Sequence, residues 1–394
     1  IRYLVSDYFN EYIFALMTDQ LRIYSKVSIG CILCALFLLS SCTKDRIILW
    51  QIGESDNSCT EFALAPKEYK QFLEKDFGWE DKYYLIGLSR PDTNWPYVLP
   101  GPSDQWGGTW STSGWRSHRL NILFGIDELP RSGKWSLYID ILDCNSKDLP
   151  IIKISINGKT WKYQIPQGSG QNSIEGETID STQFRITIPF PSGLVKRGGN
   201  EISLTTLQGS WLLFDQIRLE APESTQLKAI NEAFIRKVVA GEYEIDSPSG
   251  NTQALLVDIE HINGRPQLQV LLEGDEILSE FLEAGRYIFE APMPAVSSKT
   301  RSHYEILLND DIIQSGEIER NPYSTNGPAD YVDTKTGSAH SRWMIAPGPW
   351  MPFSMVKLSP DNQNAGWQAG YDPIFENIAG FSHIHEWTMA GLLM

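Results

Sequence analysis

The chain has 394 residues, which leaves room for two or three domains of ordinary size. Its composition, 42% hydrophobic and 11% aromatic, is typical of a globular protein and excludes a largely disordered one. A net charge of −16 predicts no nucleic-acid partner, because such a surface repels phosphates and no run of Lys and Arg is long enough to offset it locally.

The start of the chain has the order of elements that is typical of an export signal. The sequence opens with Ile1, and Met17 is the first plausible initiator. A short basic region with Arg22 and Lys26 precedes the apolar run VSIGCILCALFLL at 27–39. This run is shorter than the roughly 20 residues that span a bilayer, and it has the length of a signal core. The pattern therefore predicts export rather than a membrane-spanning helix.

The sequence LSSC, which ends at Cys42, resembles the bacterial lipobox. The resemblance implies that a signal peptidase cuts before Cys42 and that the thiol of this residue carries a diacylglyceryl group. We therefore expect residues 1–41 to be upstream residues and signal, and residues 42–60 to form a lipid-anchored tether at the outer membrane or cell surface. The alternative is a short buried helix with an incidental cysteine.

The other four cysteines divide into two pairs. Cys31 and Cys34 lie inside the signal, so their C-x-x-C spacing is no redox or zinc motif here. Cys59 and Cys144 remain, and an oxidising compartment would allow them to form a disulfide, a question that the sequence leaves open.

From about Ile47 to Ala221 the chain alternates short β-prone runs with turn chemistry, which predicts an all-β module, and we place the carbohydrate-binding-like jelly roll at residues 61–221. About seven runs at this spacing favour a β-sandwich. Asn157 and Gly158 lie between two alternating runs and predict a tight hairpin. The runs are YYLIGL, RLNILFGI, WSLYIDIL, IIKISINGKTWKYQI, QFRITIPF, NEISLTTL and WLLFDQIRLE.

One connection of this module, between YYLIGL and RLNILFGI, is rich in Gly, Pro, Ser and Trp, and we expect it to be irregular. It carries Trp95, Trp106, Trp110 and Trp115. Flat indole faces stack on the C–H faces of sugar rings, so these four are candidate sugar contacts. The alternative for each Trp is a place in the core of a β-sandwich.

This module resembles the C-terminal carbohydrate-binding-like domain of family 4 polysaccharide lyases, the rhamnogalacturonan lyases. The resemblance implies a jelly-roll binding module and not the lyase chemistry, since no part of the chain resembles the catalytic domain of that family. The motifs that carry it are YYLIGLSRPDTNWPYVLPGPSDQW, RLNILFGIDELPRSGKWSLYIDI, KISINGK and SWLLFDQIRLEAP.

Residues 222–324 predict a second, smaller β-sandwich that serves as a spacer. The segment opens with ESTQLKAINEAFIRKVVAGEYEI, for which we expect a short helix and then a strand. Asn309 and Asp310 predict another tight hairpin. The acidic residues of this segment are interpreted as a solvated face.

Residues 325–394 follow a turn-rich boundary and are unusually rich in Trp, His, Gly and Pro. We expect AGFSHIHEW to be extended, which places Phe381, His383, His385 and Trp387 on one face. Three roles stay open for this cluster: contacts to sugar hydroxyls, a metal site, for which further ligands are not identifiable, or structural hydrogen bonds. The candidate sugar-binding residues are His383, His385, Glu386, Trp387, Trp343, Trp350 and Trp367.

The last segment resembles the N-terminal domain of glycoside hydrolase family 92, the calcium-dependent exo-acting α-mannosidases. The resemblance implies an inverting hydrolase whose catalytic carboxylates and calcium ligands lie in a larger C-terminal (α/α) domain. Ser354 replaces the usual Gly, and EWTMAGLLM replaces the common Leu-Ser-Gly-Thr-Gly sequel, which puts the sugar specificity in doubt. The motifs are YVDTKTGS, APGPWMPFSMVKLSPDNQ, GWQAGYD and IAGFSHIHEW.

The sequence therefore predicts an all-β chain: a jelly roll, a smaller β-sandwich and the truncated start of a third β-sandwich domain. We interpret it as the N-terminal portion of a lipid-anchored glycan-degrading enzyme, inactive alone, with α-mannosides or plant polysaccharides as ligands. Calcium is implied for the full-length enzyme, and no cofactor is expected on this chain. Inverting hydrolysis needs two carboxyl groups, and no pair is promoted among Asp333, Asp361, Asp372, Glu376 and Glu386.

Two rival interpretations remain. One is a non-catalytic surface lipoprotein that captures glycans for other enzymes, and the other is an accessory protein of a lyase.

Overall fold

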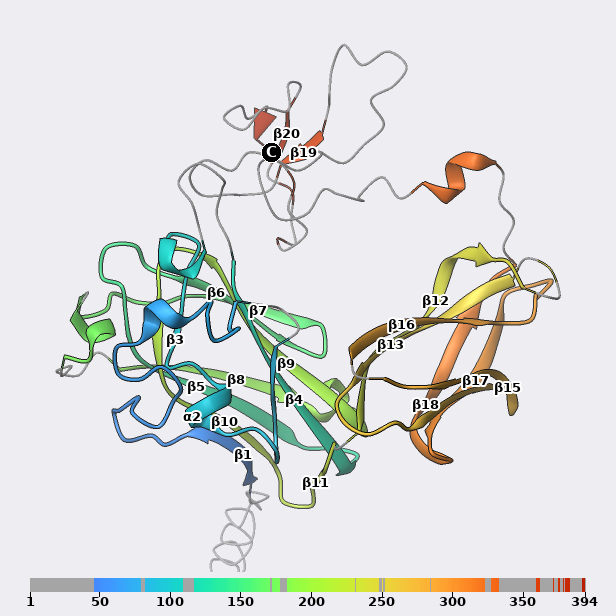
Figure 1. Cartoon of the computed structure of the whole chain (residues 1–394), viewed down its shortest axis with the longest axis horizontal. Helices are drawn as coiled ribbons and strands as arrows, with labels where there is room; N and C mark the ends of the chain where they lie inside the picture. Colours follow the sequence, from blue (N-terminus) through green and yellow to red (C-terminus); the bar gives the residue numbers. More distant parts are fainter. Residues whose placement is uncertain are drawn as a thin grey trace, which may run out of the picture. The chain divides into compact units, whose positions relative to one another are not determined.

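The structure is a computed structural model, and it describes most of the chain from Arg46 to Tyr331 and isolated positions beyond. The described residues are 46–78, 82–108, 117–170, 172–177, 183–230, 232–247, 250, 252–283, 285–322, 327–332, 359–361, 371, 375, 378, 380–382 and 392–393. Figure 1 shows that this part consists almost entirely of strands, as the sequence predicts. Among these residues, no helix has the length and apolar character needed to cross a membrane.

The first domain consists of two sheets, one of five strands and one of six. The first sheet has the order β1 (Arg46–Gly53), β10 (Leu212–Pro222), β5 (Lys134–Cys144), β8 (Phe184–Pro191), with β3 (Val98–Leu99) also paired to β10. The second has the order β11 (Gln226–Lys228), β4 (Arg119–Glu128), β9 (Gly198–Gln208), β6 (Ile151–Ile156), β7 (Lys159–Gln164), with β2 (Tyr83–Leu85) paired to β4.

The strand order is that of a jelly roll. From β1 to β11 the chain crosses from one sheet to the other after every strand except β6, because β6 and β7 are neighbours in the same sheet. The sequence-based prediction of a jelly-roll sandwich is therefore confirmed.

Strand β1 corrects the predicted start of this domain. Residues 42–60 were expected to be a tether, yet residues 46–53 of this segment form β1 beside β10. Trp50 and Ile52 of β1 are buried in the core, where the alternation of a half-buried strand places them. The domain also ends later than residue 221, because β11 pairs with β4.

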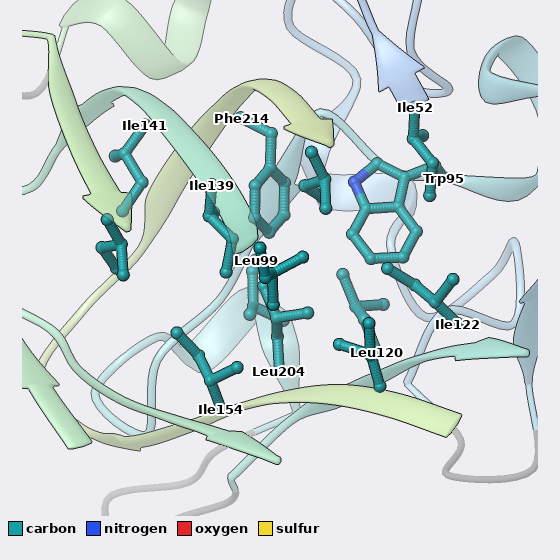
Figure 2. Close-up of a cluster of buried hydrophobic side chains, with 14 of the residues drawn as sticks. Ile52, Trp95, Leu99, Leu120, Ile122, Ile139, Ile141, Ile154, Leu204 and Phe214 are labelled. Carbon is teal, nitrogen blue, oxygen red and sulfur yellow. The ribbon is translucent and has the colours of Figure 1, made fainter. Parts of the chain in front are cut away.

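The core of the jelly roll lies between the two sheets. Ile139 of β5 and Phe214 of β10 come from the first sheet, and Ile122, Ile154 and Leu204 come from the second (Figure 2). These side chains are fully buried, so each removes its apolar surface from water at about 25 cal/mol per Å².

Both predicted hairpins are confirmed. Asn157 and Gly158 have φ angles of 47° and 86° in the turn between β6 and β7. Asn309 and Asp310 have φ angles of 49° and 69° in the turn between β17 (Thr300–Leu308) and β18 (Asp311–Arg320). Two successive residues with positive φ are typical of the turn that matches the twist of two-residue hairpins.

The second domain is a seven-stranded antiparallel sandwich, as predicted. One sheet has the order β12 (Ala233–Ile245), β13 (Thr252–His261), β16 (Gly285–Pro292), and the other β15 (Asp275–Phe281), β14 (Gln267–Leu272), β17 (Thr300–Leu308), β18 (Asp311–Arg320). The helix expected near its start is wrong, because the described residues between Pro222 and Ile245 form β11 and β12. Val238, Val239 and Ile245 are β-branched residues that favour such a strand.

Short helical turns interrupt the loops of the chain. They are η1 (Tyr69–Gln71), α2 (Pro91–Asn94), η2 (Gln105–Gly107), η3 (Asn172–Glu175), η4 (Ser192–Leu194) and η5 (Pro328–Tyr331).

A small antiparallel sheet lies in the last segment. Its order is β19 (Ser359–Asp361), β20 (Gly380–Ser382), β21 (Leu392–Leu393). Strand β20 supports the extended conformation expected for AGFSHIHEW as far as Ser382, and His383 onward lies outside the described residues.

Candidate functional site

The connections at one end of the jelly roll surround a cavity of about 460 Å³, called the loop-end cavity below. Antiparallel pairing brings these connections together: Cys144 at the end of β5 is opposite Leu212 at the start of β10, and Ile151 at the start of β6 is opposite Gln208 and Gln164. The cavity is lined by Tyr69, Ser103, Asp104, Trp106, Asn145, Lys147, Asp148, Asn172, Ile174, Glu175, Ser210 and Trp211.

Trp106 supplies a half-buried aromatic surface in this cavity. It lies in the short turn η2, and the edge-on ring of Tyr69 holds it at a centroid distance of 5.0 Å. Phe72 makes a second edge contact at 6.1 Å. The turn requires a glycine next to Trp106, because a Cβ atom on Gly107 would lie 2.9 Å from the Cβ atom of Pro100. Packing therefore fixes the indole while leaving part of it exposed.

The carboxylate of Asp104 joins two of the loops. It is 7% exposed, and it accepts hydrogen bonds from the hydroxyl of Ser210 at 2.7 Å and the backbone N–H of Gly101 at 2.8 Å. Burial raises the pKa of Asp104 to about 6, although these hydrogen bonds and a Trp106 side-chain contact act in the opposite direction. Asp104 thus fixes the loop that carries Trp106 against the β9–β10 connection.

Asp148 offers an exposed carboxylate whose backbone is fixed. The side-chain oxygen of Asn145 accepts hydrogen bonds from the backbone N–H groups of Lys147 and Asp148, both at 2.9 Å. The hydroxyl of Ser103 donates to the Asp148 carboxylate, and the backbone N–H of Ser210 donates to the Asp148 carbonyl at 2.9 Å. These contacts hold one wall of the cavity without using all the acceptor positions of the carboxylate.

The turn η3 forms another wall of the cavity, beside those that Trp106 and Asp148 provide. Its carbonyl at Ile174 accepts a hydrogen bond of 2.6 Å from the buried hydroxyl of Tyr97, which ties the turn to the core. Asn172 and Glu175 of the same turn are exposed at the rim of the cavity.

This arrangement suits the binding of a small polar ring with an apolar face. An indole accepts the C–H face of such a ring, and carboxylate and amide groups placed around it hydrogen-bond the hydroxyls. The described residues contain no group of three His, Cys, Asp or Glu side chains placed to hold a metal ion.

The structure separates the predicted tryptophans of the jelly roll. Trp106 lines the cavity, whereas Trp95 is 1% exposed and packs in the core against Phe214, at 5.4 Å, and Tyr84, at 6.0 Å (Figure 2). Trp95 is therefore a core residue, which corrects its assignment as a sugar contact. Trp110 and Trp115 lie outside the described residues. The loop itself is less irregular than expected, since it contains α2, β3 and η2.

The other sequence-predicted residues are mostly not described. Cys42, Trp343, Trp350, Trp367, His383, His385, Glu386 and Trp387 lie outside the described residues, as do Asp333, Asp372 and Glu376. Asp361 is 6% exposed in β19.

Cys59 and Cys144 are both buried as free thiols, so the structure contains no disulfide between them. Burial raises the pKa of Cys59 to about 11 and that of Cys144 to about 12.

Sequence reasoning missed Asp104, Asp148, Asn172 and Ser210 as residues of the site. They come from four different connections, and only the strand order brings these connections to one end of the sandwich. The one usable signal was local: polar residues in the turns after predicted strands.

Two segments of the chain match known families. Residues 48–219 match the carbohydrate-binding-module-like domain described as polysaccharide lyase family 4, domain III. Residues 331–393 match the glycosyl hydrolase family 92 N-terminal domain. The rhamnogalacturonate lyase of Dickeya dadantii (strain 3937) is 25% identical over 186 residues, 45% of this chain and 28% of that protein. The chain thus spans less than a third of the length of this curated relative.

Similar solved structures include two carbohydrate-binding modules and a hydrolase. A family 35 module from an environmental isolate is 16% identical with a TM-score of 0.21, covering 31% of this chain and 76% of that one. The corresponding module of Cellvibrio japonicus Abf62 is 17% identical with a TM-score of 0.20, over 31% and 76%. A GH2 β-galacturonidase from Eisenbergiella tayi is 10% identical with a TM-score of 0.20, over 51% and 34%.

Both resemblances read from the sequence are thereby confirmed by the family matches. The chain combines a domain of the family 4 lyase carbohydrate-binding type with a segment of the family 92 N-terminal type, and both are glycan-related.

Proposed function

We propose that the jelly roll binds glycans through the loop-end cavity. The observation that carries this proposal is the half-buried Trp106, which is fixed by Tyr69 and Phe72 next to the carboxylates of Asp104 and Asp148. A sugar ring would stack on the indole and donate hydroxyl hydrogen bonds to the Asp148 carboxylate and the Asn172 amide oxygen.

Replacement of Trp106 tests this role. The whole chain is titrated against soluble mannan, galactan and polygalacturonate by affinity electrophoresis and calorimetry. Trp106→Ala should weaken binding of the preferred glycan about tenfold or more, as removal of a central aromatic contact does. Trp161→Ala is the matched control, because Trp161 is half-buried on β7 and does not line the cavity. Equal binding by wild type and Trp106→Ala would refute the proposal.

We propose further that the chain acts as part of an exported glycoside hydrolase that removes α-mannosyl units with calcium. The match of residues 331–393 to the family 92 N-terminal domain supports this role. In the family resemblance, the reacting carboxylates and the calcium ligands belong to a following helical domain. The described residues offer no three-ligand group for calcium, so no step of the reaction is assigned to them.

The hydrolase role is tested by expressing the gene together with the DNA downstream of the codon for Met394. The product should release mannose from α-mannosides when calcium is present, and chelation should abolish the release. Preserved glycan binding without mannose release would favour the rival role of a glycan-capturing lipoprotein.

Anchoring at the cell surface is a separate proposal that rests on the LSSC sequence ending at Cys42. Cells fed labelled fatty acid should label the wild-type chain and not Cys42→Ser. Unlabelled wild-type protein would refute lipidation.

A further inference from the structure

The loop-end cavity carries an excess of negative charge. Four of its lining residues have acidic or basic side chains, namely Asp104, Asp148, Glu175 and Lys147. Three carboxylates and one ammonium leave two net negative charges when all four are ionised. The described lining residues include no arginine, the side chain that binds carboxylates through two parallel hydrogen bonds.

One of these negative charges is positioned by hydrogen bonds. The Ser103 hydroxyl donates to the Asp148 carboxylate, and the side chain of Asn145 accepts from the Asp148 backbone N–H. Burial is the main cause of the raised pKa of Asp104, and the nearby charge of Asp148 acts in the same direction. The whole chain, at −16, adds a weaker field of the same sign.

Resting on the proposed glycan-binding function, we propose that the loop-end cavity selects neutral glycans and discriminates against polyuronates. A neutral sugar donates hydroxyl hydrogen bonds to the carboxylates, which, when ionised, can accept hydrogen bonds but cannot donate them. A uronate unit at the same place adds a carboxylate that also only accepts hydrogen bonds and is repelled by Asp148 and Glu175. The chemistry of the wall therefore favours the uncharged ring.

Repulsion between the cavity carboxylates and a uronate should give a measurable preference for the neutral sugar, and this preference should depend on salt. A uronate carboxylate about 7 Å from two uncompensated charges should bind about fivefold more weakly than its neutral counterpart at low ionic strength. The difference should shrink to about twofold at physiological salt, because the Debye length falls to about 8 Å.

The test compares one polysaccharide in charged and uncharged forms. The neutral glycan of the panel that binds with dependence on Trp106 is oxidised at its primary hydroxyls to the polyuronate, and part of this product is methyl-esterified to remove the charge. The whole chain is titrated with both products in chelator and again with calcium. We expect the ester to bind about fivefold more tightly than the polyuronate at low salt.

Two double variants decide whether charge causes the difference. Asp148→Asn combined with Glu175→Gln should bring the polyuronate and its ester to nearly equal affinity, and the amide oxygen introduced by Asp148→Asn would still accept the hydrogen bond from Ser103. Glu128→Gln combined with Glu223→Gln removes the same charge from exposed positions where β4 and β10 end, away from the cavity, and should leave the preference unchanged.

The outcomes separate this inference from the proposed function. If a polyuronate binds with dependence on Trp106 as tightly as the neutral form, in chelator or with calcium, the selectivity is overturned while glycan binding stands. The selectivity is likewise overturned if the cavity double variant keeps the full preference. If no glycan shows dependence on Trp106, the proposed function itself fails, and the selectivity fails with it.

Discussion

The structure assigns opposite roles to two tryptophans of one loop, and this assignment gives the sharpest prediction. Trp95 is 1% exposed and packs against Tyr84 and Phe214, whereas Trp106 is half-buried at the loop-end cavity. Trp95→Ala should therefore destabilise the jelly roll and leave the chemistry of the cavity wall intact. Trp106→Ala should change the stability only slightly and should remove the aromatic wall of the cavity.

The magnitude follows from burial and domain size. Replacing a fully buried Trp with Ala removes its transfer free energy and leaves a cavity, at a cost of about 3–5 kcal/mol. In a domain of roughly 180 residues, 1 kcal/mol shifts the Tm by about 2–4 °C, so we expect Trp95→Ala to lower the Tm by about 6–20 °C. Trp95→Phe keeps most of the apolar volume and should cost less than half as much.

Differential scanning calorimetry of the whole chain, followed by glycan titration below the transition, measures both effects. Trp106→Ala is the matched control, and its Tm should change by only a few degrees because its side chain keeps contact with solvent. A Trp95→Ala variant with an unchanged Tm and lost glycan binding would show that Trp95 contacts ligand and that its placement in the core is wrong.

Three further predictions concern the same domain. Burial raises the pKa of Asp104 from 3.8 to about 6 in the folded protein, so the folded state binds the proton more tightly than the unfolded state. The free energy of unfolding should therefore fall by about 3 kcal/mol as the pH rises from about 4 to about 7. Urea unfolding should show this pH dependence in wild type and not in Asp104→Asn, and identical pH profiles would contradict it. Gly101→Ala should lower the free energy of unfolding by about 3 kcal/mol, because the added Cβ atom would lie 2.1 Å from the carbonyl oxygen of Gly209. Gly158→Ala should lower it by about 1–2 kcal/mol, because the space is open but the φ angle is 86°. Equal unfolding midpoints would refute this ranking. Ile52→Ala in β1 should destabilise the domain by about 2–5 kcal/mol in chemical unfolding, whereas a tether at this position would tolerate the change.

Local features were predictable from the sequence because short-range chemistry sets them. The hairpins at Asn157 and Asn309 depend on residues that accept positive φ, and both formed where the sequence placed them. Short β-prone runs between turn residues located β4 to β10; β6 and β8 alternate because one face of each is buried, whereas β4 and β10 are buried along most of their length. The two family resemblances likewise rest on contiguous motifs, so they needed no knowledge of the fold.

Other features depend on contacts between residues far apart in the chain. The sequence of β1 is β-prone, but its place shortly after the export signal put it in the expected tether, and its pairing with β10, more than 150 residues later, makes it a strand of the sandwich. Trp95 and Trp106 lie in similar surroundings of Gly, Pro and Ser, and only the tertiary structure decides that one enters the core and the other lines the cavity.

The sequence by itself determined the strands from β4 to β10, the tight turns and the type of each matched domain, since these depend on neighbouring residues. The tertiary structure alone decided the membership of the candidate site. Asp104 meets Ser210, and Ser103 meets Asp148, because antiparallel pairing brings separate connections to one end of the jelly roll. A polar residue in a loop carries no local sign of the partner that the opposite loop will supply.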